Sequence, residues 1–261
     1  MFSILNDNNI IFIYQFLISF ISSFLIVSFQ NKYRNFIKIN FSGPQKIHNN
    51  FVPRFGGISF FISLIFFICF FDTKHINSFV LILISCLPAF VSGLCEDFTN
   101  LITPKTRLFA SIVSGILFIS LFEIRITNVG ISFIDYSLGL EYLSIFVTVL
   151  SVAMLIQAYN IIDGLNGLAI INFIGVLFAV FFISNEVEDQ FLLELSLCLF
   201  FGIIGVFLLN FPFGKIFLGD GGAYFIGAVS AILVIILSQK HDEVRPAASL
   251  LIIIYPVYEL I

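Results

Sequence analysis

Charged residues are scarce in this 261-residue chain: they make up 11% of it, whereas hydrophobic residues make up 59%. A soluble domain carries roughly 25% charged residues, so the composition excludes a water-soluble globular fold. The net charge of −4 gives no indication of nucleic-acid binding. We therefore expect a membrane protein that has no nucleic acid among its partners.

Cysteine is also sparse, with four residues and no CxxC spacing. This pattern disfavours both a disulfide framework and a zinc site. A basic segment is missing before the first apolar run, and that run, at residues 10–29, is too long for the core of a signal peptide. We expect it to remain in the protein as a membrane span.

What the chain has is a succession of apolar runs. A helix needs about 20 apolar residues to cross a bilayer. Nine runs meet or approach this length, at residues 10–29, 55–71, 79–95, 108–122, 143–162, 164–184, 195–209, 221–238 and 246 to the end. They predict an all-α polytopic membrane protein with about nine transmembrane helices, forming one integral-membrane domain over residues 1–261. Residues 124–138 alternate loosely and predict a short periplasmic hairpin.

Basic residues predict the orientation, because lysine and arginine accumulate on the cytoplasmic side. With the amino terminus outside, the inward loops hold eight of the twelve basic residues, namely Lys32, Arg34, Lys38, Lys46, Arg54, Lys105, Arg107 and Lys215. Most acidic residues then lie in the outward loops. We therefore expect the amino terminus to lie outside.

Four acidic residues lie inward instead: Glu96, Asp97, Asp163 and Asp220. Each is at or within a span end, where an unpaired carboxylate is costly to bury, which makes it a candidate functional residue. They come from three separate inward loops, which predicts a site where several helices converge. Such carboxylates suit Mg²⁺, which prefers oxygen ligands and completes its shell with water and phosphate. A helix-capping role is the alternative for any single acid.

Two glycine-containing loops carry further candidates. In Asn160-Ile-Ile-Asp-Gly-Leu-Asn166-Gly-Leu, polar groups recur every three residues while the glycines weaken a helix. This favours a broken, polar helix end facing a cavity, although an ordinary turn with capping residues is the alternative. In Asn210-Phe-Pro-Phe-Gly-Lys215-Ile-Phe217-Leu-Gly-Asp-Gly-Gly, the loop opens a span whose exposed amides favour phosphate. Lys215 adds positive charge, and Phe217 can stack on a base or belong to the core.

The first inward loop carries Lys46, His48 and Arg54 just before the glycine pair Gly56-Gly57. All three side chains can contact phosphate. A plain surface histidine is the alternative interpretation of His48.

Taken in their order along the chain, these loops resemble those of the polyprenyl-phosphate N-acetylhexosamine-1-phosphate transferase family, glycosyltransferase family 4. This family is related to phospho-MurNAc-pentapeptide transferase. The resemblance begins at Lys46. It comprises K-x-H…P-R-F-G-G, the acidic pair before T-P-K-T-R-L, N-x-x-D-G-x-N-G-L, and N-F-P…K-I-F-L-G-D-G-G. The P-R-F-G-G form resembles the O-antigen and teichoic-acid branch more than the peptidoglycan branch.

The resemblance implies transfer of a HexNAc-1-phosphate, with GlcNAc-1-phosphate as first candidate, from a UDP-HexNAc donor to undecaprenyl phosphate. UMP is released and a cell-envelope glycan is started. The implied place is the cytoplasmic face of the bacterial inner membrane, and the lipid bilayer is therefore a partner. Mg²⁺ is the implied cofactor, with Mn²⁺ as an alternative. The sequence leaves a homodimer open.

The resemblance also implies roles for individual residues. Asp220 and Asn160 would ligate the metal, and the catalytic candidates are Glu96, Asp97 and Asp163. The substrate-binding candidates are Lys46, His48, Arg54, Arg107, Asn160, Asn166, Asn210, Lys215 and Phe217. Direct attack by the lipid phosphate and a two-step route through an acyl phosphate on Asp97 are both open.

The chain also departs from the family pattern. Glu96 stands where the family usually has Asp, and Asn166 where it often has a second Asp. The family continues into a histidine-rich inward loop and a tenth span, so we expect this chain to be truncated at its carboxyl end. Two further hypotheses follow: a catalytically impaired scaffold, and a secondary transporter. The transporter is disfavoured because the acids gather on one face and no internal repeat is visible.

Overall fold

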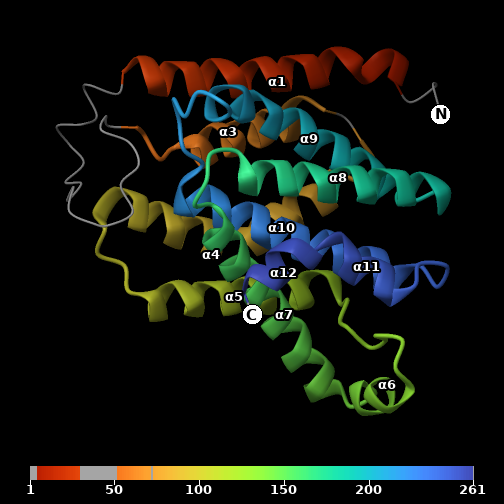
Figure 1. Cartoon of the computed structure of the whole chain (residues 1–261). Helices are drawn as coiled ribbons and strands as arrows, with labels where there is room; N and C mark the ends of the chain where they lie inside the picture. The colour runs from red at the N-terminus through yellow and green to blue at the C-terminus, as the bar shows by residue number, and fades with distance from the viewer. Residues whose placement is uncertain (1–4, 30–51, 72, 261) are drawn as a thin grey trace.

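The computed structural model describes residues 5–29, 52–71 and 73–260, and within these ranges every regular element is an α-helix (Figure 1). Seven helices are long and apolar enough to cross a membrane: α1 (Leu5–Ser28), α4 (Ile76–Thr99), α5 (Pro104–Phe122), α7 (Glu141–Ile162), α8 (Leu168–Glu186), α9 (Gln190–Asn210) and α10 (Gly219–Lys240). The expected all-α polytopic membrane fold is confirmed.

Two of the nine predicted spans differ from these seven helices. The apolar helix α3 (Gly56–Phe70) has 15 residues, and at 1.5 Å per residue it covers only about 22 Å. The last run is divided into α11 (Pro246–Ile252) and α12 (Ile254–Leu260), so the prediction of one continuous helix there is wrong. Pro256 explains the break, because a proline ring crowds the carbonyl four residues earlier, at Ile252.

The predicted hairpin over 124–138 is also wrong. Its first part is extended but has no partner strand, and its second part forms the short helix α6 (Ser132–Leu138). Side chains of α7 take the bonds that a second strand would have made. The Thr148 hydroxyl accepts the N–H of Ile126 at 2.8 Å, and the Ser144 hydroxyl donates to the Ile126 carbonyl at 2.9 Å.

Helix α10 lies at the centre of the bundle (Figure 1), and every residue from Gly221 to Leu237 is buried. Small residues allow its neighbours to approach at backbone distance, as is common between membrane helices. A Cβ atom added to Gly57 of α3 would lie 2.5 Å from the Cα of Gly222, and one added to Gly93 of α4 would lie 2.5 Å from the amide nitrogen of Gly221. The start of α10 is therefore closely packed between α3 and α4.

The loops that carry the sequence motifs share one end of the bundle, on the left in Figure 1. They follow α4, α7 and α9, and the last of them leads into α10. Helix α6 lies at the other end. The fold thus brings together segments that are far apart in the sequence.

The close contact of α4 with α10 generates a stability prediction. Gly93→Ala should lower the free energy of unfolding by about 1–3 kcal/mol, because the new methyl group meets backbone atoms that cannot rotate away. Gly175→Ala in α8 is the matched control, since nothing lies within 4 Å of its added Cβ. Thermal unfolding in detergent measures both variants. Equal unfolding temperatures would contradict the packing described here.

Candidate functional site

A carboxylate from the end of α4 holds the start of α10. Asp97 accepts the N–H of Asp220 at 3.0 Å with one oxygen and the N–H of Gly221 at 2.9 Å with the other. The first amides of a helix have no partner inside the helix and lie at the positive end of its dipole, so an anion is stabilising there. Asp97 is only 4% exposed. This residue, predicted to be catalytic, caps a distant helix in the structure.

Arg107 reaches the same place from α5. Its guanidinium donates to Oδ2 of Asp220 at 2.7 Å, and both side chains are partly buried. The placement of Arg107 follows from local sequence, because Thr103 caps α5 and Pro104 occupies its first turn. The structure therefore pairs a predicted phosphate contact with the predicted metal ligand.

Glu96 lies beside Asp97 in sequence but makes a different contact. Its carboxylate accepts the N–H of Ile102 at 2.8 Å. Asn100, in the left-handed conformation, ends α4 just before this point. Glu96 thus closes the loop between α4 and α5 that delivers Arg107.

Asp163 ends α7 and lies close to the other acids. Burial raises the pKa of its carboxyl group well above the ordinary value, and the negative charges of Asp220 and Asp97 raise it further, while Arg54 opposes the shift. These side chains come from four different segments. The end of the bundle therefore concentrates negative charge that a cation would relieve.

The first loop joins the site through its backbone. The N–H of Phe217 donates to the Pro53 carbonyl at 2.9 Å, and the N–H of Gly56 donates back to the Phe217 carbonyl at 2.9 Å. Gly219 adopts a φ of +81° against the Arg54 carbonyl, where a side chain would not fit. Arg54 itself is exposed next to this ladder. The two other candidates on this loop, Lys46 and His48, lie outside the described residues.

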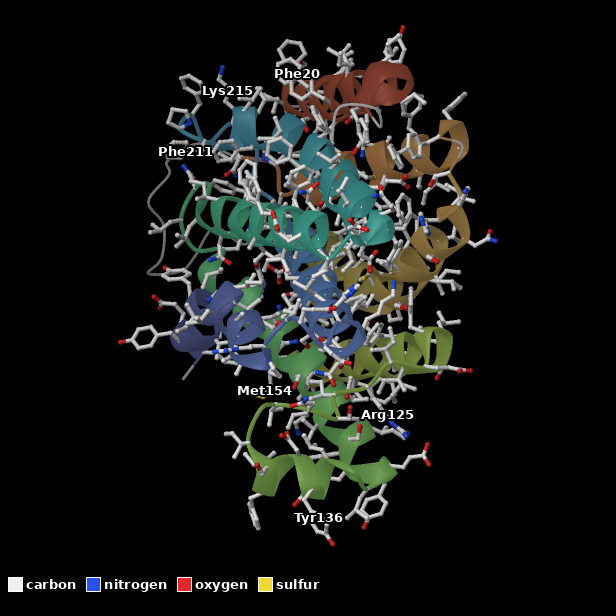
Figure 2. The ribbon with its side chains drawn as sticks, turned by 90° about the vertical axis from the view of Figure 1, so that its right-hand side faces the viewer. Phe20, Arg125, Tyr136, Met154, Phe211 and Lys215 are labelled. Carbon is white, nitrogen blue, oxygen red and sulfur yellow. The ribbon has the colours of Figure 1, made fainter. Side chains whose placement is uncertain are left out.

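Asn210 organises the loop before α10. Its side-chain amide donates to the Ile216 carbonyl at 2.7 Å, and the residue is 3% exposed. Lys215 is exposed on the outer side of the same loop, as Figure 2 shows, with its ammonium group 5.1 Å from the centre of the Phe213 ring. Phe217 is partly buried. Of these candidates, Asn210 shapes the loop and Lys215 remains accessible.

The loop after α7 packs against the loop after α9. A Cβ atom on Gly214 would lie 2.7 Å from the Asn166 amide nitrogen, and one on Gly167 would lie 2.9 Å from Phe211. Asn160 is partly buried in the last turn of α7. The structure thus brings Asn166 to the loop of Asn210 and Lys215.

Sequence reasoning missed a polar network beneath these loops. The Tyr159 hydroxyl donates to Asn172 of α8 at 2.9 Å and accepts from Ser230 of α10 at 3.1 Å. Gln157 of α7 donates to Ser111 of α5 at 2.9 Å. A buried tyrosine usually has a hydrogen-bond partner for its hydroxyl. Tyr159 in an apolar run could therefore have indicated a polar partner on a neighbouring helix. The network fixes the end of α7 against three neighbours.

The acids offer oxygen donors of the kind that a metal ion can take. Within the described part of the chain, no three side chains of His, Cys, Asp or Glu form a group able to hold a metal ion. Mg²⁺ usually takes one or two carboxylates and completes its shell with waters and substrate phosphates. Asp220, Asp163 close to it, and Asn160 one helical turn before Asp163 are oxygen donors of that type.

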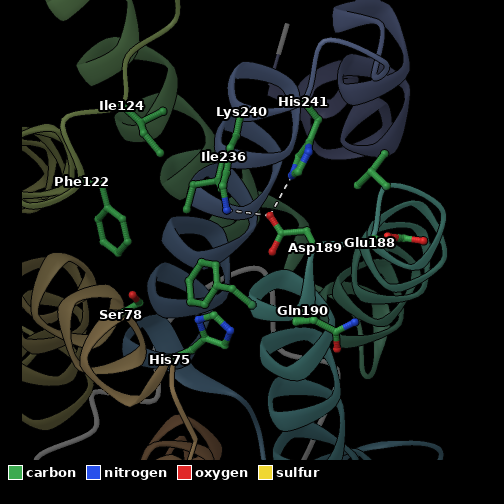
Figure 3. Close-up of a pocket in the computed structure, with 12 residues that line it drawn as sticks. His75, Ser78, Phe122, Ile124, Glu188, Asp189, Gln190, Ile236, Lys240 and His241 are labelled. Atoms are coloured by element: carbon green, nitrogen blue, oxygen red, sulfur yellow. Dashed lines mark hydrogen bonds and ion pairs between the residues drawn. The ribbon is translucent and has the colours of Figure 1, made fainter. Parts of the chain in front are cut away.

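A cavity of about 550 Å³ opens at the opposite end of the bundle (Figure 3). Asp189 lies at its centre and accepts from Lys240 at 2.8 Å, with His241 at 2.7 Å from the same oxygen. Burial tends to raise the pKa of the Asp189 carboxyl group, but the hydrogen bonds from Lys240, Leu192 and His241 outweigh it, so the pKa is lowered. None of the predicted site residues lines this cavity. Its charged groups tie the turn before α9 to the end of α10.

Comparison with known proteins finds a matching family and several similar proteins. The sequence model of Glycosyl transferase family 4 matches residues 79–238, which include Asp97, Asp163 and Asp220. The chain is similar to three proteins named phospho-N-acetylmuramoyl-pentapeptide-transferase. The one from Streptococcus gordonii is 29% identical over 198 residues, covering 72% of this chain and 61% of the relative. Those from Streptococcus pneumoniae D39 and Staphylococcus epidermidis ATCC 12228 are 27% and 25% identical, covering 72% and 76% of this chain and 60% and 66% of the relatives. The chain therefore spans less than two thirds of their length.

Proposed function

This chain belongs to glycosyl transferase family 4, and from that premise we propose that it transfers a HexNAc-1-phosphate from a UDP-sugar to undecaprenyl phosphate. UMP is the second product, and GlcNAc-1-phosphate is the first candidate for the group transferred. The observation that carries the proposal is the convergence of Asp97, Asp163, Arg107 and Asp220 at the start of α10. We place the reaction at the cytoplasmic face of the bacterial inner membrane.

The arrangement supplies what phosphoryl transfer needs. That reaction depends mainly on positioning and on neutralising charge, with little covalent work for the protein. Arg54 and Arg107 bring positive charge to the same end as the glycine-rich turn. Asp220 and Asn160 would hold Mg²⁺, or Mn²⁺ in its place. When bound, the ion would neutralise charge on the phosphate oxygens.

Nucleotide recognition belongs to the loop before α10. The hydrogen bond from Asn210 fixes Ile216 and thereby the position of Phe217. We assign the aromatic face of Phe217 to the base and exposed Lys215 to the phosphates. Asn166 lies against Gly214 of the same loop, which supports a role in the same pocket.

The contacts of Asp97 favour a direct attack by the lipid phosphate. Both oxygens of Asp97 already accept backbone N–H groups, and forming an acyl phosphate would break one of these bonds and loosen the start of α10. The lipid phosphate is itself ionised and needs no base. Glu96 and Asp163 are left as the carboxylates that orient the substrates.

The relatives and the loop sequence suggest different donors. The relatives carry the name of a muramoyl-pentapeptide enzyme, whereas the P-R-F-G-G sequence resembles the O-antigen and teichoic-acid branch. A donor panel that contains UDP-GlcNAc, other UDP-HexNAc sugars and UDP-MurNAc-pentapeptide separates these branches.

The transfer is tested by UMP release from this panel, with undecaprenyl phosphate and Mg²⁺ in detergent. We expect UMP from one donor and its loss in EDTA. Asp220→Asn should lower the rate about a hundredfold or more, because it removes a charge that holds the metal. Lys105→Gln, an exposed change in the α5 segment that precedes Arg107, should retain activity. A folded wild-type protein that releases no UMP from any donor would favour the scaffold, and full activity of Asp220→Asn would refute the assignment.

The direct mechanism predicts that, in the absence of undecaprenyl phosphate, free UMP is not incorporated into the UDP-sugar donor. Labelled UMP is incubated with the donor and delipidated protein, and the label in the UDP-sugar is then measured. We expect none until undecaprenyl phosphate is added, because no covalent sugar-phosphate enzyme forms. Exchange without lipid that disappears in Asp97→Asn would instead establish the acyl-phosphate route.

A further inference from the structure

Arg107 is paired with Asp220, the carboxylate that the proposed function assigns to the metal. One guanidinium nitrogen donates to Oδ2 of Asp220 at 2.7 Å, and the two side chains are 19% and 23% exposed. Arginine stays protonated at every accessible pH. A dication and this guanidinium therefore compete for the same oxygen.

The Arg107 guanidinium lies beside Asp220 and Tyr224, and part of its donor capacity is unused. Only one nitrogen contacts Asp220, although a guanidinium can hold a carboxylate or phosphate with two parallel bonds. Its Nε is buried and has no hydrogen-bond partner among the described residues. A buried donor that lacks a partner is costly, so a ligand with several acceptor oxygens offers Arg107 a better partner than Asp220 does.

The anchoring of α5 lets the side chain move while its backbone stays in place. The Arg107 carbonyl accepts from the Ser111 hydroxyl at 3.0 Å, and Gln157 of α7 donates to that hydroxyl at 2.9 Å. The end of α4 is joined to the same segment through Glu96 and the N–H of Ile102. Only the guanidinium has to change partners.

We propose that the Arg107 guanidinium pairs with Asp220 while no metal is bound. When the metal binds Asp220, the guanidinium moves to the diphosphate of the donor. The inference rests on the proposed function and goes beyond it. It makes metal and donor binding cooperative, because the metal releases Arg107 for the phosphates and the phosphates draw Arg107 away from Asp220. Coupling of this kind is reciprocal between the two ligands.

The test measures Mn²⁺ binding by the intensity of the free-ion EPR signal, in the absence of any nucleotide. Arg107→Gln should bind Mn²⁺ about fivefold or more tightly than the wild type, because the competing cation is gone. Arg107→Lys should tighten binding less, since an ammonium group still competes. Lys105→Gln removes the same charge from the same helix and should leave the affinity unchanged.

A second measurement uses equilibrium dialysis of labelled UDP with and without saturating Mn²⁺. The gain in UDP affinity on adding Mn²⁺ should be smaller in Arg107→Gln than in the wild type, because the coupling through Arg107 is lost. Unchanged Mn²⁺ affinity in Arg107→Gln, or equal tightening in Lys105→Gln, would overturn the inference while leaving the transferase proposal standing. A wild-type protein that binds neither Mn²⁺ nor UDP would overturn both.

Discussion

Two hydrogen bonds that the first amides of α10 donate to the Asp97 carboxylate are the interaction on which the site depends. They join the end of α4 to the start of the central helix. The helices can come this close only because Gly93 and Gly221 have no side chains. The N–H of Asp220 makes one of these bonds, so the backbone of Asp220 is held in place before any ligand binds.

Charge at this end of the bundle is divided into a fixed part and an adaptable part. Asp97 is compensated by helix amides and belongs to the fixed part. Asp163 and Asp220 lie close to it and to each other, and Arg107 and Arg54 compensate them only in part. A site of this kind can accept a dication and a polyanion together, since each relieves what the other would leave uncompensated. The opposite end differs, because Asp189 there has both a lysine and a histidine as partners.

Sequence alone predicted the helical membrane fold, and it also singled out the segments that meet at the candidate site. Apolar runs are local signals, and so are the threonine and proline that begin α5. The capping role of Asp97 was not predictable in detail, because its partners lie more than 100 residues away in the sequence. Arg107 was expected to contact phosphate, and its pairing with Asp220 likewise depends on how α5 packs.

The errors have physical causes in particular residues. The predicted periplasmic hairpin does not form, because Thr148 and Ser144 of α7 make the hydrogen bonds to the backbone of Ile126. The last span was expected to be continuous, yet Pro256 allows it to break. The network around Tyr159 was overlooked because one polar residue in an apolar run looks like ordinary packing.

Hydrogen exchange at the amides of Asp220 and Gly221 tests most directly whether Asp97 organises this site. The measurement compares the wild type with Asp97→Ala, using the amides in the middle of α9 as an internal reference. We predict that both amides exchange slowly in the wild type and much faster in the variant, while the α9 amides do not change. Equal exchange rates at Asp220 and Gly221 in the two proteins would contradict the account.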